Sequence, residues 1–258
     1  MTSPEPFGPF TLDVAGHAPG VAVATLDRPP VNAFDVAAYV GLTDLVSAVE
    51  SQESIKVLVL AAREGARCWC GGADLRDFRG MDAERRRERY DVVNAAIPRL
   101  QAARLPVIAA ITGHAIGIGV LLAAAADLRV ASEKAGFACP EVDFGLVAGS
   151  SRLLNYLGMP ESQIREMAYT GRRLPASALL ATGFLNAVTP PEQVLPHCLS
   201  LATEIAAKSG PVLRARKQAF VEHESMDWLE AYRLAQGLSG GLVALPEARE
   251  GVKAALRK

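Results

Sequence analysis

The chain of 258 residues lacks several features that would each point to a particular class of protein. It has no excess of one charge, because 27 Lys and Arg stand against 28 Asp and Glu. The chain therefore has no overall positive field that would attract nucleic acid, and a nucleic-acid partner is not expected. No apolar run approaches the ~18 residues that a membrane-spanning helix needs, so we expect no membrane partner. Residues 1–9 contain no basic stretch followed by an apolar one, which predicts a cytoplasmic protein without a signal peptide.

Cysteine is also scarce, and its spacing excludes the common metal sites. The four cysteines are Cys68, Cys70, Cys139 and Cys198. This pattern does not match the ligand spacing of a zinc site, and the first two are too close together for an ordinary disulfide framework. We therefore expect free thiols in a reducing compartment and no bound metal.

Hydrophobic residues, in contrast, make up half of the chain. Without membrane spans, such a share indicates that apolar surface is buried between subunits. The chain is long enough for one large domain, or for a core with an appendage. We expect an oligomer.

The segment from Pro106 to Asp127 combines three signals in one continuous unit. Val107 to Ile111 is a short β-branched run, typical of a strand covered on both faces. Val120 to Ala126 has the Leu and Ala content of a buried helix. Gly117 and Gly119 lie between them and allow a tight turn. The helix should therefore begin in a space lined by glycine, with unpaired N–H groups at its first turn.

Such a turn has several possible uses. A phosphate-binding P-loop requires Lys and then Ser or Thr after the last glycine, but Val120 and Leu121 follow Gly119. The dinucleotide fingerprint requires a third glycine that is not present. An oxyanion hole remains, because its donors are backbone amides. A glycine turn that only lets the helix pack close to the strand is an equally simple interpretation.

The preceding chain contains the same order of elements. Strands at Thr11–Val14 and Val21–Leu26 form a predicted hairpin, and Val36–Val49 has helical spacing. The strand Ile55–Ala61 leads into a second glycine turn over residues 65–75. With right-handed crossovers, both glycine turns lie at the same end of a sheet. Further helices are expected at Asp82–Ala103, Ala176–Ala181, Pro191–Lys208, Pro211–His223, Asp227–Gln236 and Pro246–Lys258.

Three motifs in order resemble the enoyl-CoA hydratase/isomerase, or crotonase, superfamily. They are CWCGGADL, ITGHAIGIGVLLAAAADLRVA and FACPEVDFGL. The resemblance runs from about Thr11 to the C-terminus. It implies an α/β fold with a crotonase-like core of repeated ββα units arranged as a spiral, here residues 1–200. A C-terminal helical oligomerisation region, residues 201–258, would follow.

The resemblance also implies a partner and an assembly. The partner is an acyl-CoA thioester, so coenzyme A is part of the substrate and no separate cofactor is expected. The assembly is a homotrimer or a dimer of trimers. Coenzyme-binding residues implied by the family's pattern are Arg28, Arg67, Gly71, Gly72, Ala73 and Lys258.

For the reaction, the resemblance assigns oxyanion-hole amides to Ala73 and Ile118 and a catalytic carboxylate to Glu141. Family hydratases carry a second glutamate where this chain has Leu121, and leucine cannot hold a water or move a proton. A single carboxylate favours double-bond isomerisation of an enoyl-CoA. Syn hydration of 2-enoyl-CoA is the alternative reaction.

Other positions should line the substrate pocket. Gly117 and Leu121 follow from the family pattern, and Asp143 would share the face of Glu141 if this segment were extended. A solvated or helix-capping side chain is the favoured alternative for Asp143. Ile118 stands where the family usually has glycine or alanine, which should narrow the acyl site. Residues 145–158 are also shorter than the family's glycine-rich loop.

Two further hypotheses belong to other classes of protein. One is a catalytically silent relative that binds acyl-CoA or RNA; the arginines of residues 84–89 would favour RNA, but their interspersed glutamates favour a solvated helix face. The other is a serine hydrolase, because residues 237–241 match the nucleophile elbow around Ser239. An amphipathic helix precedes this motif, so we interpret its glycines as a helix stop.

Overall fold

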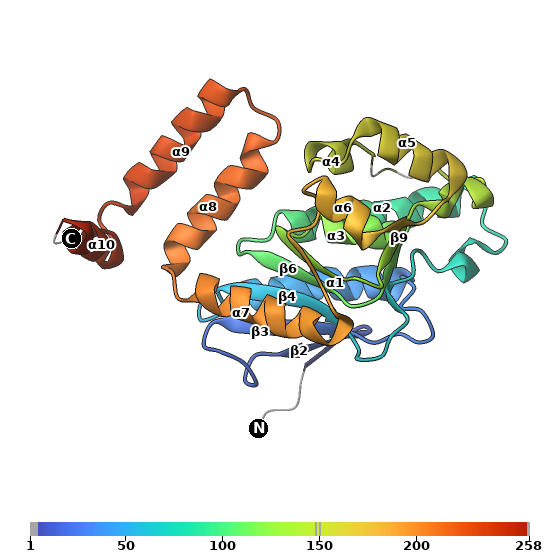
Figure 1. The fold of residues 1–258 in the computed structure, drawn as a ribbon, viewed down its shortest axis with the longest axis horizontal. Helices are drawn as coiled ribbons and strands as arrows, with labels where there is room; N and C mark the ends of the chain where they lie inside the picture. The colour runs from blue at the N-terminus through green and yellow to red at the C-terminus, as the bar shows by residue number, and fades with distance from the viewer. Residues whose placement is uncertain (1–4, 148, 150, 257–258) are drawn as a thin grey trace.

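The computed structural model describes residues 5–147, 149 and 151–256. Within these residues the strands form two sheets, ordered β1-β2-β3-β4-β6-β8-β11 and β10-β9-β7-β5 (Figure 1). The larger sheet contains β1 (Glu5–Phe7), β2 (Phe10–Asp13), β3 (Val21–Leu26), β4 (Val57–Ala62), β6 (Val107–Ile111), β8 (Leu128–Ser132) and β11 (Ala187–Thr189). The smaller sheet contains β5 (Cys68–Cys70), β7 (His114–Ile116), β9 (Gly136–Ala138) and β10 (Leu174–Pro175).

The helices connect these strands and extend beyond them. They are α1 (Val36–Glu50), α2 (Ala83–Gln101), α3 (Ile118–Ala124), α4 (Ser151–Tyr156), α5 (Glu161–Thr170), α6 (Ala176–Ala181), α7 (Val194–Ala206), α8 (Gly210–His223), α9 (Trp228–Leu242) and α10 (Pro246–Ala255). Short 3₁₀ segments are η1 (Leu75–Phe78), η2 (Pro140–Phe144) and η3 (Pro191–Gln193).

The expected repetition of ββα units is confirmed: β2 and β3 both lie in the larger sheet, and from β4 onward the units divide their two strands between the sheets. In the unit β4-β5-α2 the first strand joins the larger sheet and the second joins the smaller one. The unit β6-β7-α3 does the same, and β8 and β9 follow this pattern. The chain therefore spirals between two sheets.

The larger sheet is covered on both faces, which explains its uninterrupted hydrophobic strands. On one face Val57 and Val59 pack with Cys198 and Ala202 of α7. On the other face Leu58 packs into the core formed with α1, α2, α3 and the smaller sheet. Successive side chains of a strand point to opposite faces, so one run of apolar residues serves both layers.

The C-terminal helices form a separate arm (Figure 1). Lys217 of α8 is buried and binds Asp127, with Nζ 2.8 Å from Oδ1. This ion pair connects α8 to the turn between α3 and β8. No residue of α9 within the described chain is buried. Residue 200, where the predicted boundary falls, lies inside α7, which packs on the sheet.

Several expectations from the sequence need correction. Strand β7 lies between β6 and α3, where only a turn was predicted. Helices α4 and α5 were not predicted. Residues 237–241 do not end the preceding helix, because α9 continues to Leu242. A helix there is favoured because α9 packs lengthwise on α8, which outweighs the low helix propensity of glycine.

Candidate active site

Three sequence motifs meet because they follow three neighbouring parallel strands. In the smaller sheet β5 pairs with β7 and β7 pairs with β9, all in the same direction. The carboxyl ends of parallel strands share one edge of a sheet. Gly71 and Gly72 follow β5, Gly117 follows β7, and η2 with Glu141 follows β9. The expectation that both glycine turns share one end of a sheet is confirmed.

Glycine allows these turns to approach each other closely. Gly117 has φ +55° and ψ −117°, and a Cβ there would lie 2.8 Å from Glu141 Oε1 and 3.8 Å from the Cα of Gly72. Gly72 has φ +98°, and its Cβ would lie 3.1 Å from the carbonyl oxygen of Ile116. These positive φ angles disfavour other residues. The geometry joins the two glycine turns and Glu141 at one point.

Two backbone amides at this point have no partner among the described residues. Phe34 N donates to Gly72 O, and Asp74 N donates to Phe34 O, both at 2.8 Å. These bonds skip Ala73, whose N–H therefore points away from residue 34. Ile118 begins α3, so its N–H has no intrahelical acceptor. Neither Ala73 N nor Ile118 N donates a hydrogen bond to another described residue.

Glu141 is a carboxylate with free accepting capacity. Its Oε2 is buried and has no hydrogen-bond partner among the described residues. Burial raises the pKa of Glu141 above its ordinary value, because desolvation disfavours the charged form. The backbone holds the residue, since Leu146 N donates to Glu141 O at 2.9 Å. This arrangement suits a group that accepts a proton.

A cavity of about 400 Å³ adjoins Glu141. Its wall is largely apolar, with Leu146, Leu154, Ile164 and Met167 from the loop after η2 and from α4 and α5. The cavity also contains Glu161, whose Oε1 lies 3.0 Å from Arg165 Nε. The space has the character of a small-molecule site: apolar walls with few polar groups.

The structure separates the other predicted pocket residues from this cavity. Leu121 packs partly buried against the core and lines a second cavity of about 380 Å³ with Ile97 and Leu153. Ser151 and Leu154 of α4 face the first cavity, whereas Leu153 and Arg152 face the second. Helix α4 therefore stands between them, and Leu121 and Glu141 do not line one cavity.

Asp143 lies outside the cavity beside Glu141. Residues 140–144 form the 3₁₀ segment η2 instead of an extended segment, so residues two apart do not share a face. Its Oδ2 lies 2.9 Å from the position of a Cβ on Gly171, at the end of α5. Asp143 is exposed and faces away from the cavity beside Glu141.

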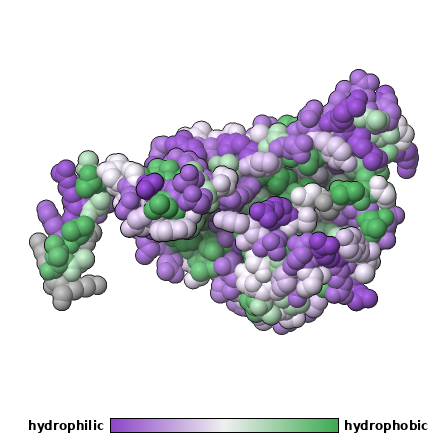
Figure 2. Space-filling model, turned by 90° about the horizontal axis from the view of Figure 1, so that it is seen from above, coloured by the Kyte–Doolittle hydropathy of each residue, from purple (hydrophilic) through white to green (hydrophobic). Residues whose placement is uncertain are grey.

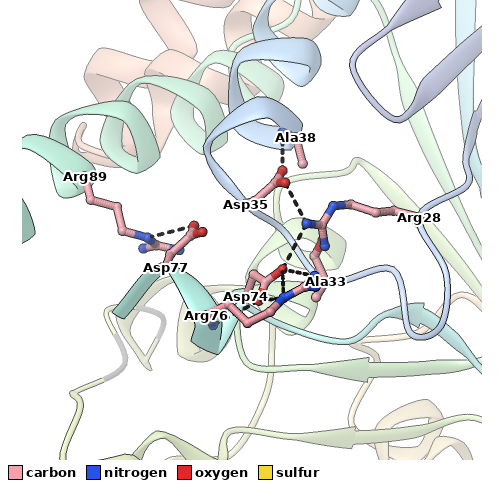
Figure 3. A network of polar contacts seen from close by, with 8 residues as sticks. All are labelled: Arg28, Ala33, Asp35, Ala38, Asp74, Arg76, Asp77 and Arg89. Carbon is pink, nitrogen blue, oxygen red and sulfur yellow. Dashed lines mark hydrogen bonds and ion pairs between the residues drawn. The ribbon is translucent and has the colours of Figure 1, made fainter. Parts of the chain in front are cut away.

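The predicted coenzyme-binding cations lie in three different situations. The guanidinium of Arg28 is held by two carboxylates, with Nη2 2.6 Å from Asp35 Oδ2 and 2.9 Å from Asp74 Oδ2 (Figure 3). Arg67 is exposed and precedes β5, so it lies at the edge of the smaller sheet opposite Glu141. Lys258 lies outside the described residues.

Sequence reasoning missed the polar network around Ala73. Asp74 follows the second glycine turn and accepts from Arg76 N at 3.0 Å as the cap of η1. It also binds both Arg28 and Arg76, and these partners hold its pKa well below its usual range. Asp35 caps α1 by accepting from Ala38 N. An acidic residue just before each helix was the available signal.

The competing sites are not supported by the structure. Ser239 lies inside α9, and a nucleophile elbow requires a strand before the serine. Arg89, expected on a solvated helix face, is 5% exposed, and its guanidinium stacks 4.5 Å from the ring centre of Phe78.

Among the described residues no three His, Cys, Asp or Glu side chains gather as metal ligands. In this same part of the chain, no helix is both long and apolar enough to cross a membrane.

The chain is similar to several known proteins. The family model described as enoyl-CoA hydratase/isomerase matches residues 16–258. The 2,3-dehydroadipyl-CoA hydratase of Escherichia coli K12 is 31% identical over 246 residues, which cover 92% of each protein. A (7aS)-7a-methyl-1,5-dioxo-2,3,5,6,7,7a-hexahydro-1H-indene-carboxyl-CoA hydrolase of Mycobacterium tuberculosis is 31% identical over 86% of this chain and 88% of its own. A solved enoyl-CoA hydratase from Mycobacterium smegmatis superposes with a TM-score of 0.90 at 27% identity, covering 98% of this chain and 97% of that one.

Proposed function

Because this chain belongs to the enoyl-CoA hydratase/isomerase family, we propose that it isomerises the double bond of an enoyl-CoA with Glu141 as its single base. Ala73 N and Ile118 N donate hydrogen bonds to the thioester oxygen. Coenzyme A enters as part of the substrate, and its pantetheine chain passes Gly71, Gly72 and Ala73.

One observation carries this proposal. Glu141 combines an unpartnered, buried Oε2 with contact to Gly117, next to the free amide of Ile118. The atom nearest to the position of a Cβ on Gly117 is Glu141 Oε1. Leucine at position 121 lines a different cavity and supplies no carboxylate, and Glu161, which shares the cavity of Glu141, is paired with Arg165.

The proposed chemistry moves one proton between two carbons. Glu141 removes a proton from C2 of a 3-enoyl thioester, and the electron pair of that C–H bond spreads onto the thioester oxygen. The two amides stabilise this dienolate, and each such donor typically contributes about 10²- to 10³-fold in rate. Protonated Glu141 then returns the proton to C4, and the double bond lies between C2 and C3. No other reactant is consumed.

Glu141 is suited to both halves of this exchange. Burial raises its pKa, which makes the carboxylate a stronger base and keeps the carboxylic acid available for the return step. Desolvation is the main influence on its pKa, and Arg165, which lines the same cavity, is paired with Glu161.

Hydration is the second candidate reaction, favoured by the names of relatives such as the Escherichia coli hydratase. In this reaction Glu141 would activate a water that adds to C3 of a 2-enoyl thioester. A single carboxylate must then both orient the water and exchange its proton. We rank this reaction below isomerisation because Glu161, the other carboxylate on the described wall of this cavity, is paired with Arg165.

The experiment is a comparison of products from 3-enoyl-CoA and 2-enoyl-CoA, identified by mass spectrometry. Glu141→Gln should reduce isomerisation by about 10²- to 10⁴-fold, because an amide cannot accept the proton. Asp143→Asn provides the matched control, since Asp143 faces Gly171. Hydration that is strong in the wild type and undiminished in Glu141→Gln would refute the assignment. Binding without any turnover would instead favour a silent acyl-CoA-binding relative.

We further propose that the protein acts as a homotrimer or a dimer of trimers. Exposed apolar side chains gather on the C-terminal arm, where Phe220, Trp228 and Tyr232 are 58%, 78% and 56% exposed. Figure 2 shows hydrophobic residues on this projecting part of the molecule. An interface between subunits would cover them.

A further inference from the structure

Ala73 depends on a neighbouring segment for its orientation. Phe34 and Ala73 form an isolated parallel bridge, in which Phe34 supplies both the N–H and the C=O. The partners of Phe34 are Gly72 O and Asp74 N, on either side of Ala73. The direction of the Ala73 N–H is therefore set by the register between residues 34 and 73.

Arg28 cross-links the two sides of this bridge. Its Nη1 donates to Ala33 O at 2.9 Å, and its Nη2 lies 2.6 Å from Asp35 Oδ2. The same Nη2 lies 2.9 Å from Asp74 Oδ2. Ala33 and Asp35 flank Phe34, and Asp74 directly follows Ala73. Figure 3 shows the guanidinium between these two segments.

Each partner of Arg28 is itself anchored. Asp35 Oδ1 accepts from Ala38 N at 2.9 Å at the start of α1. Asp74 also binds Arg76, with Oδ2 2.7 Å from Nη2, and its side chain is 7% exposed. The Arg28 backbone is fixed because Asn32 Oδ1 accepts from Arg28 N at 2.8 Å. The guanidinium thus joins α1 and the turn after β5 through groups that have little freedom.

We propose that Arg28 is a positioning residue for the Ala73 amide and makes no contact with the coenzyme. This inference rests on the oxyanion hole of the proposed function. Without Arg28, two carboxylates face each other with no shared cation, and the register of the bridge relaxes. Asp74 would still pair with Arg76, and Asp35 would still cap α1, so the fold should persist. The Ala73 N–H, however, would no longer be held in one direction.

A change in the direction of the Ala73 N–H should reduce turnover, because this donor must point at the thioester oxygen when that oxygen gains charge. A misplacement of about 1 Å can reduce turnover by about 10²-fold. Binding of the coenzyme should change little, because its nucleotide does not depend on the Ala73 N–H. The expected signature is therefore a lower kcat with a nearly constant KM.

The test measures polarisation of the thioester without requiring turnover. Bound 2,4-hexadienoyl-CoA should absorb at longer wavelength when its carbonyl receives two hydrogen bonds. We expect Arg28→Ala to bind this probe but lose most of the red shift. For the enoyl substrate, kcat should fall about 10- to 100-fold, equally with acyl-CoA and with acyl-pantetheine, which lacks the nucleotide.

Two variants serve as comparisons. Arg63→Ala is the matched control, because Arg63 Nε pairs with Asp27 Oδ1 at 2.8 Å on the surface and lies outside this network; it should keep the red shift and kcat. Arg28→Lys should give an intermediate red shift, since one ammonium cannot reproduce the planar fork of the guanidinium. If Arg28→Ala does not fold, the red shift of Arg28→Lys decides between the outcomes.

Two results would overturn the inference. One is a full red shift and an unchanged kcat in Arg28→Ala, or in Arg28→Lys if it is the only folded variant. The other is a raised KM for acyl-CoA alone, which would assign Arg28 to the nucleotide phosphates. Failure of the proposed base is distinguishable, because Glu141→Gln keeps the red shift. Absence of the shift in the wild type would refute the oxyanion hole itself.

Discussion

Gly117→Ala is the substitution for which the structure gives the most definite expectation. At φ +55° and ψ −117°, an alanine is strained, and residues in such regions typically cost about 1–3 kcal/mol. Its Cβ would lie 2.8 Å from Glu141 Oε1. Ordinary carbon–oxygen contacts begin at about 3.3 Å, so the carboxylate must move by about half an ångström. We therefore predict a loss of turnover that exceeds the loss of stability.

Gly65→Ala separates these two effects. Gly65 also has a positive φ, +73°, but a Cβ there meets nothing within 4 Å. It should cost about 1–2 kcal/mol in the free energy of unfolding and leave kcat unchanged. Gly117→Ala should lose about 10²-fold in kcat, as expected when a reacting group is displaced.

The assays are denaturant unfolding of both variants and steady-state turnover of an enoyl-CoA. An unchanged kcat in Gly117→Ala would refute the placement of Glu141 at the reacting centre. Equal losses of kcat in the two variants would show that backbone strain, and not displacement of the carboxylate, reduces activity.

Three further outcomes are expected. Glu141 must be deprotonated to accept a proton, and burial raises its pKa. As the pH decreases, kcat/KM should therefore fall with an apparent pKa above the ordinary value of ~4.3 for glutamate. An apparent pKa at or below that value would contradict this prediction. Leu121→Glu should not create hydration, because its carboxylate would enter the second cavity beside Ile97 and Leu153; it should destabilise the fold by about 1–3 kcal/mol, and a gain in hydration would show that the two cavities act as one. Sedimentation at micromolar concentration should give three or six chains, since the apolar residues of α9 are exposed in one chain, whereas a monomer would refute this assembly.

Much of the framework was predictable from local pattern. The strands β3 and β6 and the helix α6 have the expected boundaries, and the ends of α1 and α2 differ from expectation by two residues at most. These elements are determined by apolar runs and helix caps, which are signals carried by residues inside or directly beside each element. Strand β7 was missed because His114–Ile116 is too short for a periodic signal.

For the site, the three motifs could be identified from the sequence, and parallel strand order explains why their ends meet. The sequence also determined the chemistry available there, because glycine turns expose amides and position 121 has no carboxylate. Tertiary structure decided where the remaining side chains go. The guanidinium of Arg28 reaches two carboxylates, and α4 divides Leu121 from Glu141. Such contacts depend on how distant elements pack, and a local pattern of residues carries no record of that packing.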